Sequence, residues 1–188
     1  FLEKETKGKN MIRKAGATTQ KTAILLLLSL IACSAPKNSA TAKIINPQTG
    51  NVLGEAKFID TKKGVLFKIE LQAKNSATLG VHIHEYGDCS SLEAKSAGGH
   101  WNPSKETHGT WGGESFHSGD IGNIKTDKNG KGSLEVLDVF GRWSLGGEKI
   151  TSVLNKSIIV HAGRDDMTTQ PSGAAGKRIG CGVIKNKK

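Results

Sequence analysis

The sequence predicts an all-β fold, an antiparallel Greek-key β-sandwich or flattened barrel. Two observations support this prediction. Apolar residues recur with a period of two, as at Val65, Phe67, Ile69 and Leu71, which is typical of a strand with one buried face. Glycine is abundant, at 24 of 188 residues, and turn formers separate the short apolar runs, while no segment has a sustained amphipathic helical pattern.

The first 32 residues are predicted to be removed from the mature protein. Residues 1–10 are interpreted as upstream translated sequence, with Met11 as the start. Basic residues follow Met11, and the apolar run at 23–32 is too short to cross a bilayer as a helix, for which about twenty residues are needed. A basic stretch before a short apolar run that ends in small residues indicates a secretion signal.

The end of this segment suggests a lipid anchor. Leu30-Ile31-Ala32-Cys33 resembles the lipobox of bacterial lipoproteins, in which the cysteine is lipidated and becomes the mature N-terminus. We therefore expect a periplasmic or cell-envelope lipoprotein that contacts a membrane only through Cys33. Residues 33–40 would form a polar tether and residues 41–188 the folded domain. The alternative is an ordinary signal that is cut slightly later, near Ala35.

Seven short segments of the predicted domain have strand character. They cover 41–46, 52–60, 65–72, 80–85, 133–139, 157–161 and 181–185. Two long stretches, 86–118 and 162–180, lack this pattern but are rich in histidine, aspartate and arginine. Long structureless segments in a compact domain are usually functional or disordered, and here function is favoured because metal ligands and a disulfide would hold them.

The charge and the cysteine content limit the partners and the cellular compartment that we expect for the chain. The net charge is +10, but the basic residues are scattered and no nucleic-acid motif accompanies them, so we expect no nucleic-acid partner. The positive field would attract small anions. If Cys33 is lipidated, Cys89 and Cys181 are the only pair left in a chain addressed to an oxidising compartment, which favours a disulfide over two reduced core cysteines.

The histidines form a metal-ligand pattern that includes every histidine of the chain. The candidate ligands are His82, His84, His100, His108, His117, Asp120 and His161. Imidazole commonly binds copper and zinc, and a nearby carboxylate favours zinc. These groups are too many for one tetrahedral site and the right number for two four-coordinate sites that share one ligand.

The spacing assigns the ligands to two centres. His82 and His84 are two apart on a predicted strand, so both rings point to one face, and His161 at the end of another strand would complete that site. His108, His117 and Asp120 suit a closed tetrahedral zinc site on the long loop.

Two further residues connect these centres. His100 lies between the two ligand groups in sequence and is the candidate to bind both metals as an imidazolate. Asp165 is well placed to accept N–H bonds from ligand histidines and so to orient them.

The motifs resemble those of bacterial, exported copper–zinc superoxide dismutases over residues 42–185. Residues 80–89 and 173–184 are similar to the two signatures of that family, and the segments that begin at His100, His117 and Val160 lie between them in the family's order. The resemblance implies one copper and one zinc per chain. It implies copper on His82, His84, His100 and His161, and zinc on His100, His108, His117 and Asp120.

The resemblance also implies a reaction. Two superoxide anions and two protons become dioxygen and hydrogen peroxide while copper alternates between Cu(II) and Cu(I). His100 would release copper and carry a proton, Arg178 would be the active-site arginine that docks the anion, and Cys89–Cys181 the intrasubunit disulfide. Family members form dimers by different surfaces or stay monomeric, so a homodimer is allowed.

Several alternatives remain open at this stage. The chain could be a copper and zinc storage or delivery protein of the same fold, or a structural or adhesive sandwich, and Arg178 could form a surface ion pair. The segment from Trp111 to Phe116 is unusually aromatic for the metal loop and is interpreted as core cover for the zinc site. The loop from His161 to Arg178 is short for the family and contains Arg164.

Overall fold

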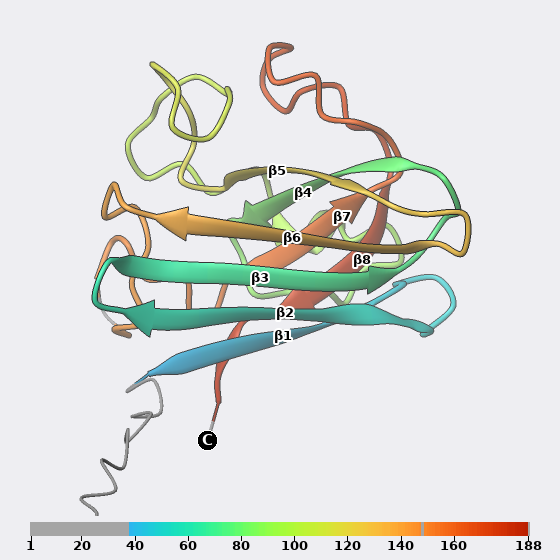
Figure 1. The fold of residues 1–188 in the computed structure, drawn as a ribbon, viewed down its shortest axis with the longest axis horizontal. Coiled ribbons are helices and arrows are strands. Elements are labelled where there is room, and N and C mark those ends of the chain that lie inside the picture. The colour runs from blue at the N-terminus through green and yellow to red at the C-terminus, as the bar shows by residue number, and fades with distance from the viewer. Residues whose placement is uncertain (1–37, 148, 188) are drawn as a thin grey trace, which may run out of the picture. The chain divides into compact units, whose positions relative to one another are not determined.

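The computed structural model describes residues 38–147 and 149–187, which form nine β-strands (Figure 1). The signal peptide, Cys33 and most of the predicted tether lie outside the described residues. The strands are β1 Ser39–Ile45, β2 Val52–Thr61, β3 Gly64–Gln72, β4 Thr78–His84, β5 Asp120–Lys125, β6 Lys131–Asp138, β7 Ser157–His161, β8 Arg178–Val183 and β9 Lys185–Asn186. A short 3-10 helix, η1, covers Lys95–Ala97, and among the described residues no helix is long and apolar enough to span a membrane.

The strands form a nearly closed antiparallel barrel. They follow the order β5-β4-β7-β8-β1-β2-β3-β6, and β9 pairs with β1. The links from β3 to β4 and from β6 to β7 cross between non-neighbouring strands, as in a Greek key, and β5 and β6 at the two ends of the order are consecutive in the chain. The predicted all-β Greek-key class is confirmed.

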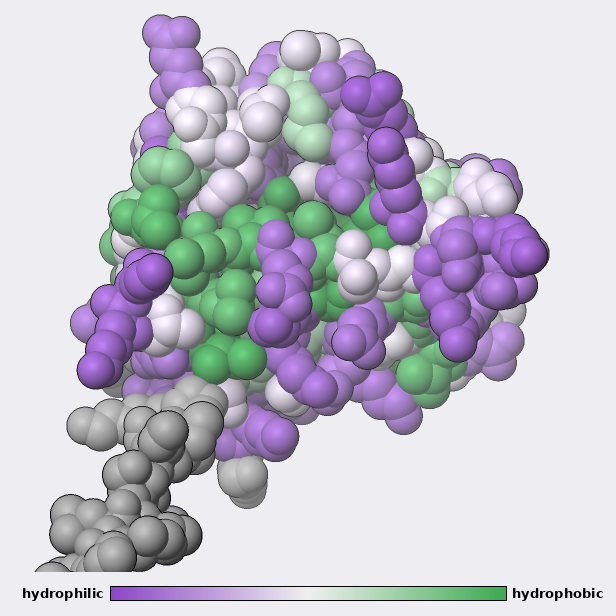
Figure 2. Space-filling model, viewed as in Figure 1, coloured by the Kyte–Doolittle hydropathy of each residue, from purple (hydrophilic) through white to green (hydrophobic). Residues whose placement is uncertain are grey.

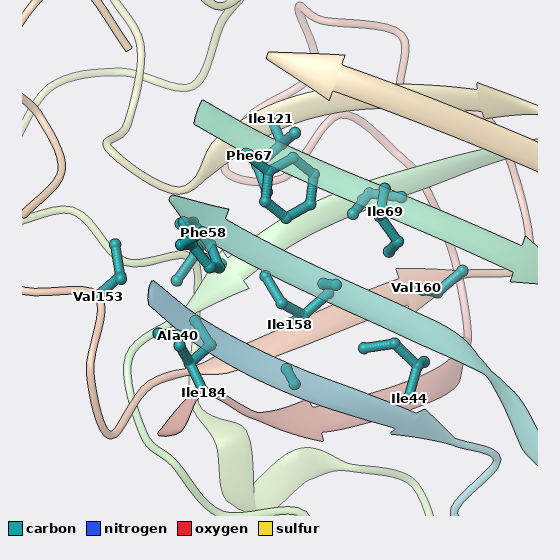
Figure 3. Packing of buried hydrophobic residues seen from close by; sticks show 14 of the residues in the cluster. Ala40, Ile44, Phe58, Phe67, Ile69, Ile121, Val153, Ile158, Val160 and Ile184 are labelled. Atoms are coloured by element: carbon teal, nitrogen blue, oxygen red, sulfur yellow. The ribbon is translucent and has the colours of Figure 1, made fainter. Parts of the chain in front are cut away.

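The barrel interior is filled by apolar side chains from both halves of the fold. Figure 3 shows Phe58 and Phe67 of β2 and β3 in front of Ile158 and Val160 of β7, all of them buried. The opposite side of β3 carries Leu66, Lys68, Glu70 and Gln72, and hydrophilic side chains cross a band of hydrophobic surface on the face shown in Figure 2. The period-two pattern thus separates a buried face from a partly exposed one.

The seven predicted strands are confirmed, with end shifts of a few residues, but β5, the two-residue strand β9 and one long connection were not expected. β5 was not predicted because its sequence, Asp-Ile-Gly-Asn-Ile-Lys, contains Gly122 and Asn123, which are poor strand formers. It pairs with β4 and has a bulge opposite Val81 and His82. In addition to the two expected long loops, 85–119 and 162–177, a third long connection at 139–156 joins β6 to β7.

A disulfide fastens the first long loop to the barrel. Cys89 and Cys181 are bonded across a sequence separation of 92 residues, with their Cα atoms 5.8 Å apart. Cys181 lies in β8, so the bond connects the loop that follows β4 to a central strand. The predicted pairing is confirmed, and the alternative of two reduced core cysteines is excluded.

Candidate metal centre

Four buried histidines converge beside β4 and β7. His82 and His84 are on β4, His161 ends β7, and His100 follows a turn and pairs with His84 through an isolated β-bridge. One nitrogen from each ring lies within 4.8 Å of the others, and we call these residues the first cluster. Bulges at His82 and at His161 interrupt the ladders at the cluster, where bulges commonly re-aim side chains.

A second cluster shares His100 with the first. It consists of His100, His108, His117 and Asp120, all buried, with one candidate ligand atom from each within 4.8 Å of the others. The Asp120 carboxylate lies 2.8 Å from Nδ1 of His100, 3.0 Å from Nδ1 of His108 and 3.2 Å from Nδ1 of His117. A tetrahedral zinc ion with bonds of about 2.0–2.1 Å would hold its ligand atoms about 3.3 Å apart, close to these separations.

Except for Nδ1 of His100, which lies 2.8 Å from the Asp120 carboxylate, the ring nitrogens that face the two clusters lack hydrogen-bond partners among the described residues. These buried atoms are Nδ1 of His82, His108 and His117 and Nε2 of His84, His100 and His161. Although Nδ1 of His108 and His117 lie near Asp120, neither contact has hydrogen-bond geometry. Leaving a buried polar atom without a partner costs about 1–3 kcal/mol, so buried nitrogens without partners call for an explanation. These nitrogens converge on two points, as the ligands of two metal ions would.

In two of the first-cluster rings, the nitrogen that faces away from the cluster donates a hydrogen bond to a backbone carbonyl. His84 donates its Nδ1–H to the carbonyl oxygen of Gly98 at 2.9 Å, and His161 donates its Nδ1–H to that of Gly176 at 3.0 Å. These bonds fix the ring orientation and leave the other nitrogen of each ring free to ligate a metal.

Asp165 connects the two clusters, as its expected orienting role requires. Its buried carboxylate accepts the Nε2–H of His82 at 2.7 Å and the Nε2–H of His108 at 2.9 Å. The Asn123 side chain holds the Asp165 backbone on both sides, since its amide donates to the Asp165 carbonyl and accepts the Asp165 N–H. Sequence reasoning missed Asn123, which belongs to the strand that was not predicted.

Burial and charge shift the pKa of His108 in the opposite direction from those of His82 and His161. Burial lowers the pKa of His82 to about 3 and that of His161 to about 4, so both rings are neutral at pH 7, as metal ligation requires. Burial also lowers the pKa of His108, but the carboxylates of Asp120 and Asp165 outweigh it and raise that pKa to about 9. The histidine contacts hold the pKa of Asp120 far below its usual range despite its burial.

Arg178 begins β8 directly opposite His161 in the ladder. Its guanidinium donates to the carbonyl oxygen of Ala94 at 2.7 Å. Its positive charge contributes, after burial, to lowering the pKa of His84 and of His161. Among the described residues it forms no ion pair.

The aromatic segment of the metal loop packs against the barrel core. Trp111 stacks on Trp143 with ring centroids 4.3 Å apart, and Phe116 packs edge-on against Trp111 and Phe140. The third long connection therefore supplies the surface that the aromatic residues cover. The packing shows core cover on the connection between β6 and β7, and cover of the zinc site stays a prediction.

Comparisons with known proteins agree with this geometry. The family model for copper/zinc superoxide dismutase matches residues 52–184. A copper–zinc superoxide dismutase of Aquifex aeolicus is 43% identical over 77% of this chain and 86% of its own length, and one of Caulobacter vibrioides is 36% identical over 78% and 86%. The solved structure of a SOD-like protein from Bacillus subtilis, 29% identical, superposes with a TM-score of 0.68 over 76% of this chain and 96% of that one.

The chain therefore belongs to the copper/zinc superoxide dismutase family. Its activity is the dismutation of superoxide, and its cofactors are copper and zinc.

Proposed function

We propose that the first cluster holds copper and the second holds zinc, with the ring of His100 shared between them. The observation that carries this proposal is the set of unpaired ring nitrogens that point into the two clusters. Four imidazoles suit a metal that changes valence, whereas three imidazoles and the Asp120 carboxylate suit the closed tetrahedral site of a zinc ion. His100 has one nitrogen in each cluster, since its Nδ1 faces Asp120 while its Nε2 is unpaired.

Bound copper supplies the one-electron change of valence, and bound zinc, which has no redox states to use, supplies a fixed positive charge. His100 holds and delivers a proton at Nε2, while the second cluster keeps its Nδ1 in place. Asp165, Gly98 and Gly176 keep the ligand rings oriented throughout. Arg178 is a permanent cation with several N–H donors, held beside His161 by the Ala94 carbonyl, and is suited to docking a small anion.

The proposal includes export and attachment. The lipobox-like sequence that ends at Cys33 supports a periplasmic or cell-envelope lipoprotein, followed by a short tether and the catalytic domain. Labelling with a radioactive fatty acid in a bacterial host tests this: the unchanged chain should incorporate label and Cys33→Ser should not. Equal labelling of the two would contradict the lipid anchor.

The enzymatic proposal is tested by loading purified protein with copper and zinc and following superoxide decay by pulse radiolysis. Decay far faster than in metal-free buffer is expected, with unbound copper removed from the loaded protein before the measurement. A copper storage or delivery protein of the same fold would bind the metals equally well and leave the decay at the buffer rate. That result would overturn the assignment.

A further inference from the structure

The backbone of one second-cluster ligand is held by a side chain from the other long loop. The His108 N–H donates to Oε1 of Gln170 at 2.9 Å, and Nε2 of Gln170 donates to the His108 carbonyl oxygen at 2.9 Å. The two bonds run in opposite directions, as between residues of an antiparallel strand pair. The Gln170 side chain thus supplies the pair of backbone hydrogen bonds that a neighbouring strand would otherwise give to His108.

The loop that carries Gln170 also contacts the His108 ring. Asp165 accepts the Nε2–H of that ring, and Gly173 returns the chain beside it. A Cβ atom at Gly173 would lie 1.8 Å from the Asp165 carboxylate and 2.6 Å from Nε2 of His108, so only glycine allows this close approach. The segment 165–173 therefore holds His108 by its ring and by its backbone, while Nδ1 faces the second cluster.

This arrangement sets His108 apart from the ligands in strands. His82, His84 and His161 have their backbones in the β4–β7 and β7–β8 ladders. His108 lies in no strand, and within the described chain its backbone N–H and carbonyl bond only to Gln170. Any displacement of this backbone moves Nδ1 relative to the other ligand atoms of the second cluster.

We propose that Gln170 is a positioning residue for zinc: it fixes the His108 backbone and thereby sets the zinc affinity of the second cluster, with little effect on copper. The proposal rests on the assignment of zinc to that cluster. A residue that only stabilised the loop would change the affinities for both metals together, because Asp165 of the same loop serves both clusters.

The test measures zinc and copper affinity separately in metal-free, disulfide-intact protein by competition with chromophoric chelators. Gln170→Ala should weaken zinc binding by about tenfold and change copper binding by less than about twofold, in line with the usual effect of residues that support ligands. Gln170→Glu keeps the acceptor for the His108 N–H but loses the donor, so it should show a smaller loss. Gln48→Ala, an exposed glutamine in the turn between β1 and β2, is the matched control.

A spectroscopic measurement accompanies the affinities. Cobalt(II) bound in the second cluster of the unchanged protein should give the intense visible absorption of a tetrahedral site, and Gln170→Ala should weaken and shift it. If Gln170→Ala does not fold, Gln170→Glu carries the same test.

The possible results separate the two proposals. Zinc affinity and cobalt spectrum of Gln170→Ala equal to those of the Gln48→Ala control would overturn the positioning role, as would equal losses of zinc and copper affinity. Failure of the unchanged protein to bind zinc at the second cluster would instead overturn the metal assignment.

Discussion

The two metal clusters share one histidine, yet they are built differently. His82, His84 and His161 of the first cluster belong to neighbouring strands whose ladders place them. His108 and His117 of the second cluster lie in the loop at 85–119. The sheet places the backbones of the three strand ligands, whereas His108 depends on Gln170 and Asp165, which are far away in the sequence.

Their electrostatics differ in the same way. Burial keeps His82 and His161 neutral, with pKa values of about 3 and 4. Two carboxylates raise the pKa of His108 to about 9. The strand histidines thus present a free nitrogen at neutral pH, while His108 gives up a proton when a metal binds.

The largest effect is expected for a ligand that belongs to the first cluster alone. His161→Ala should reduce superoxide decay to the rate in metal-free buffer and leave zinc bound, because the second cluster does not use His161. His117→Ala is the matched change in the second cluster and should lose zinc. Mass spectrometry of metal content and pulse radiolysis on the same samples check both, and full activity of His161→Ala would contradict the copper assignment.

Removal of the disulfide should come next. With both Cys89 and Cys181 changed to serine, the free energy of unfolding should fall by about 4–5 kcal/mol on the chain-entropy model, since the bond closes 92 residues. Removal of the bond should also increase the rate of zinc release more than the rate of copper release, because the bond fastens the loop that carries His108 and His117. Denaturant unfolding and metal-release kinetics measure these effects, and unchanged stability would show that the loop is held without the bond.

Asp165 supports one ligand in each cluster, so a single substitution there allows the metal affinities of the two clusters to be compared. Asp165→Ala should lower both metal affinities by about 10- to 100-fold, because His82 and His108 each lose an acceptor. The loss should be larger for zinc, since β4 still holds the His82 backbone. Glu114→Ala, which changes an exposed carboxylate of the loop at 85–119, should change neither affinity appreciably. A copper loss that exceeds the zinc loss would contradict the expected order of the two effects.

The pH dependence of the metal-free protein should distinguish the two kinds of histidine. His82 stays neutral when folded but takes up a proton when unfolded below pH 6.5, so stability is full above that pH and falls as the pH drops toward 3. The loss for His82 alone is about 1.4 kcal/mol per pH unit. His108 acts oppositely, and its contribution is lost as the pH rises from 6.5 through about 9. Urea midpoints measured from pH 5 to 9 test this, and a flat acid side would contradict it.

The sequence was sufficient to predict the strand-held part of the site. Period-two apolar patterns define most strands, and a strand places His82 and His84 on one face, so both the fold class and this pair follow from local spacing. The disulfide followed from the cysteine count and the expected compartment.

The supporting contacts could not be predicted in the same way. Gln170 and Asn123 act on backbone groups that are 62 and 42 residues away, and no local pattern marks either residue. β5 was missed because Gly122 and Asn123 hide a strand whose pairing with β4 is decided by tertiary packing. The third long connection was missed because its packing against Trp111 is a long-range contact, and such a contact leaves no periodic pattern in the sequence.

The central claim, one imidazole shared by two different metals, is tested most directly by a crystal structure of the fully loaded protein. Anomalous scattering at the copper and zinc absorption edges would identify each ion. Copper should lie against Nε2 of His100 and zinc against Nδ1 of the same ring. A His100 ring that contacts neither ion, or two ions of one element, would contradict it.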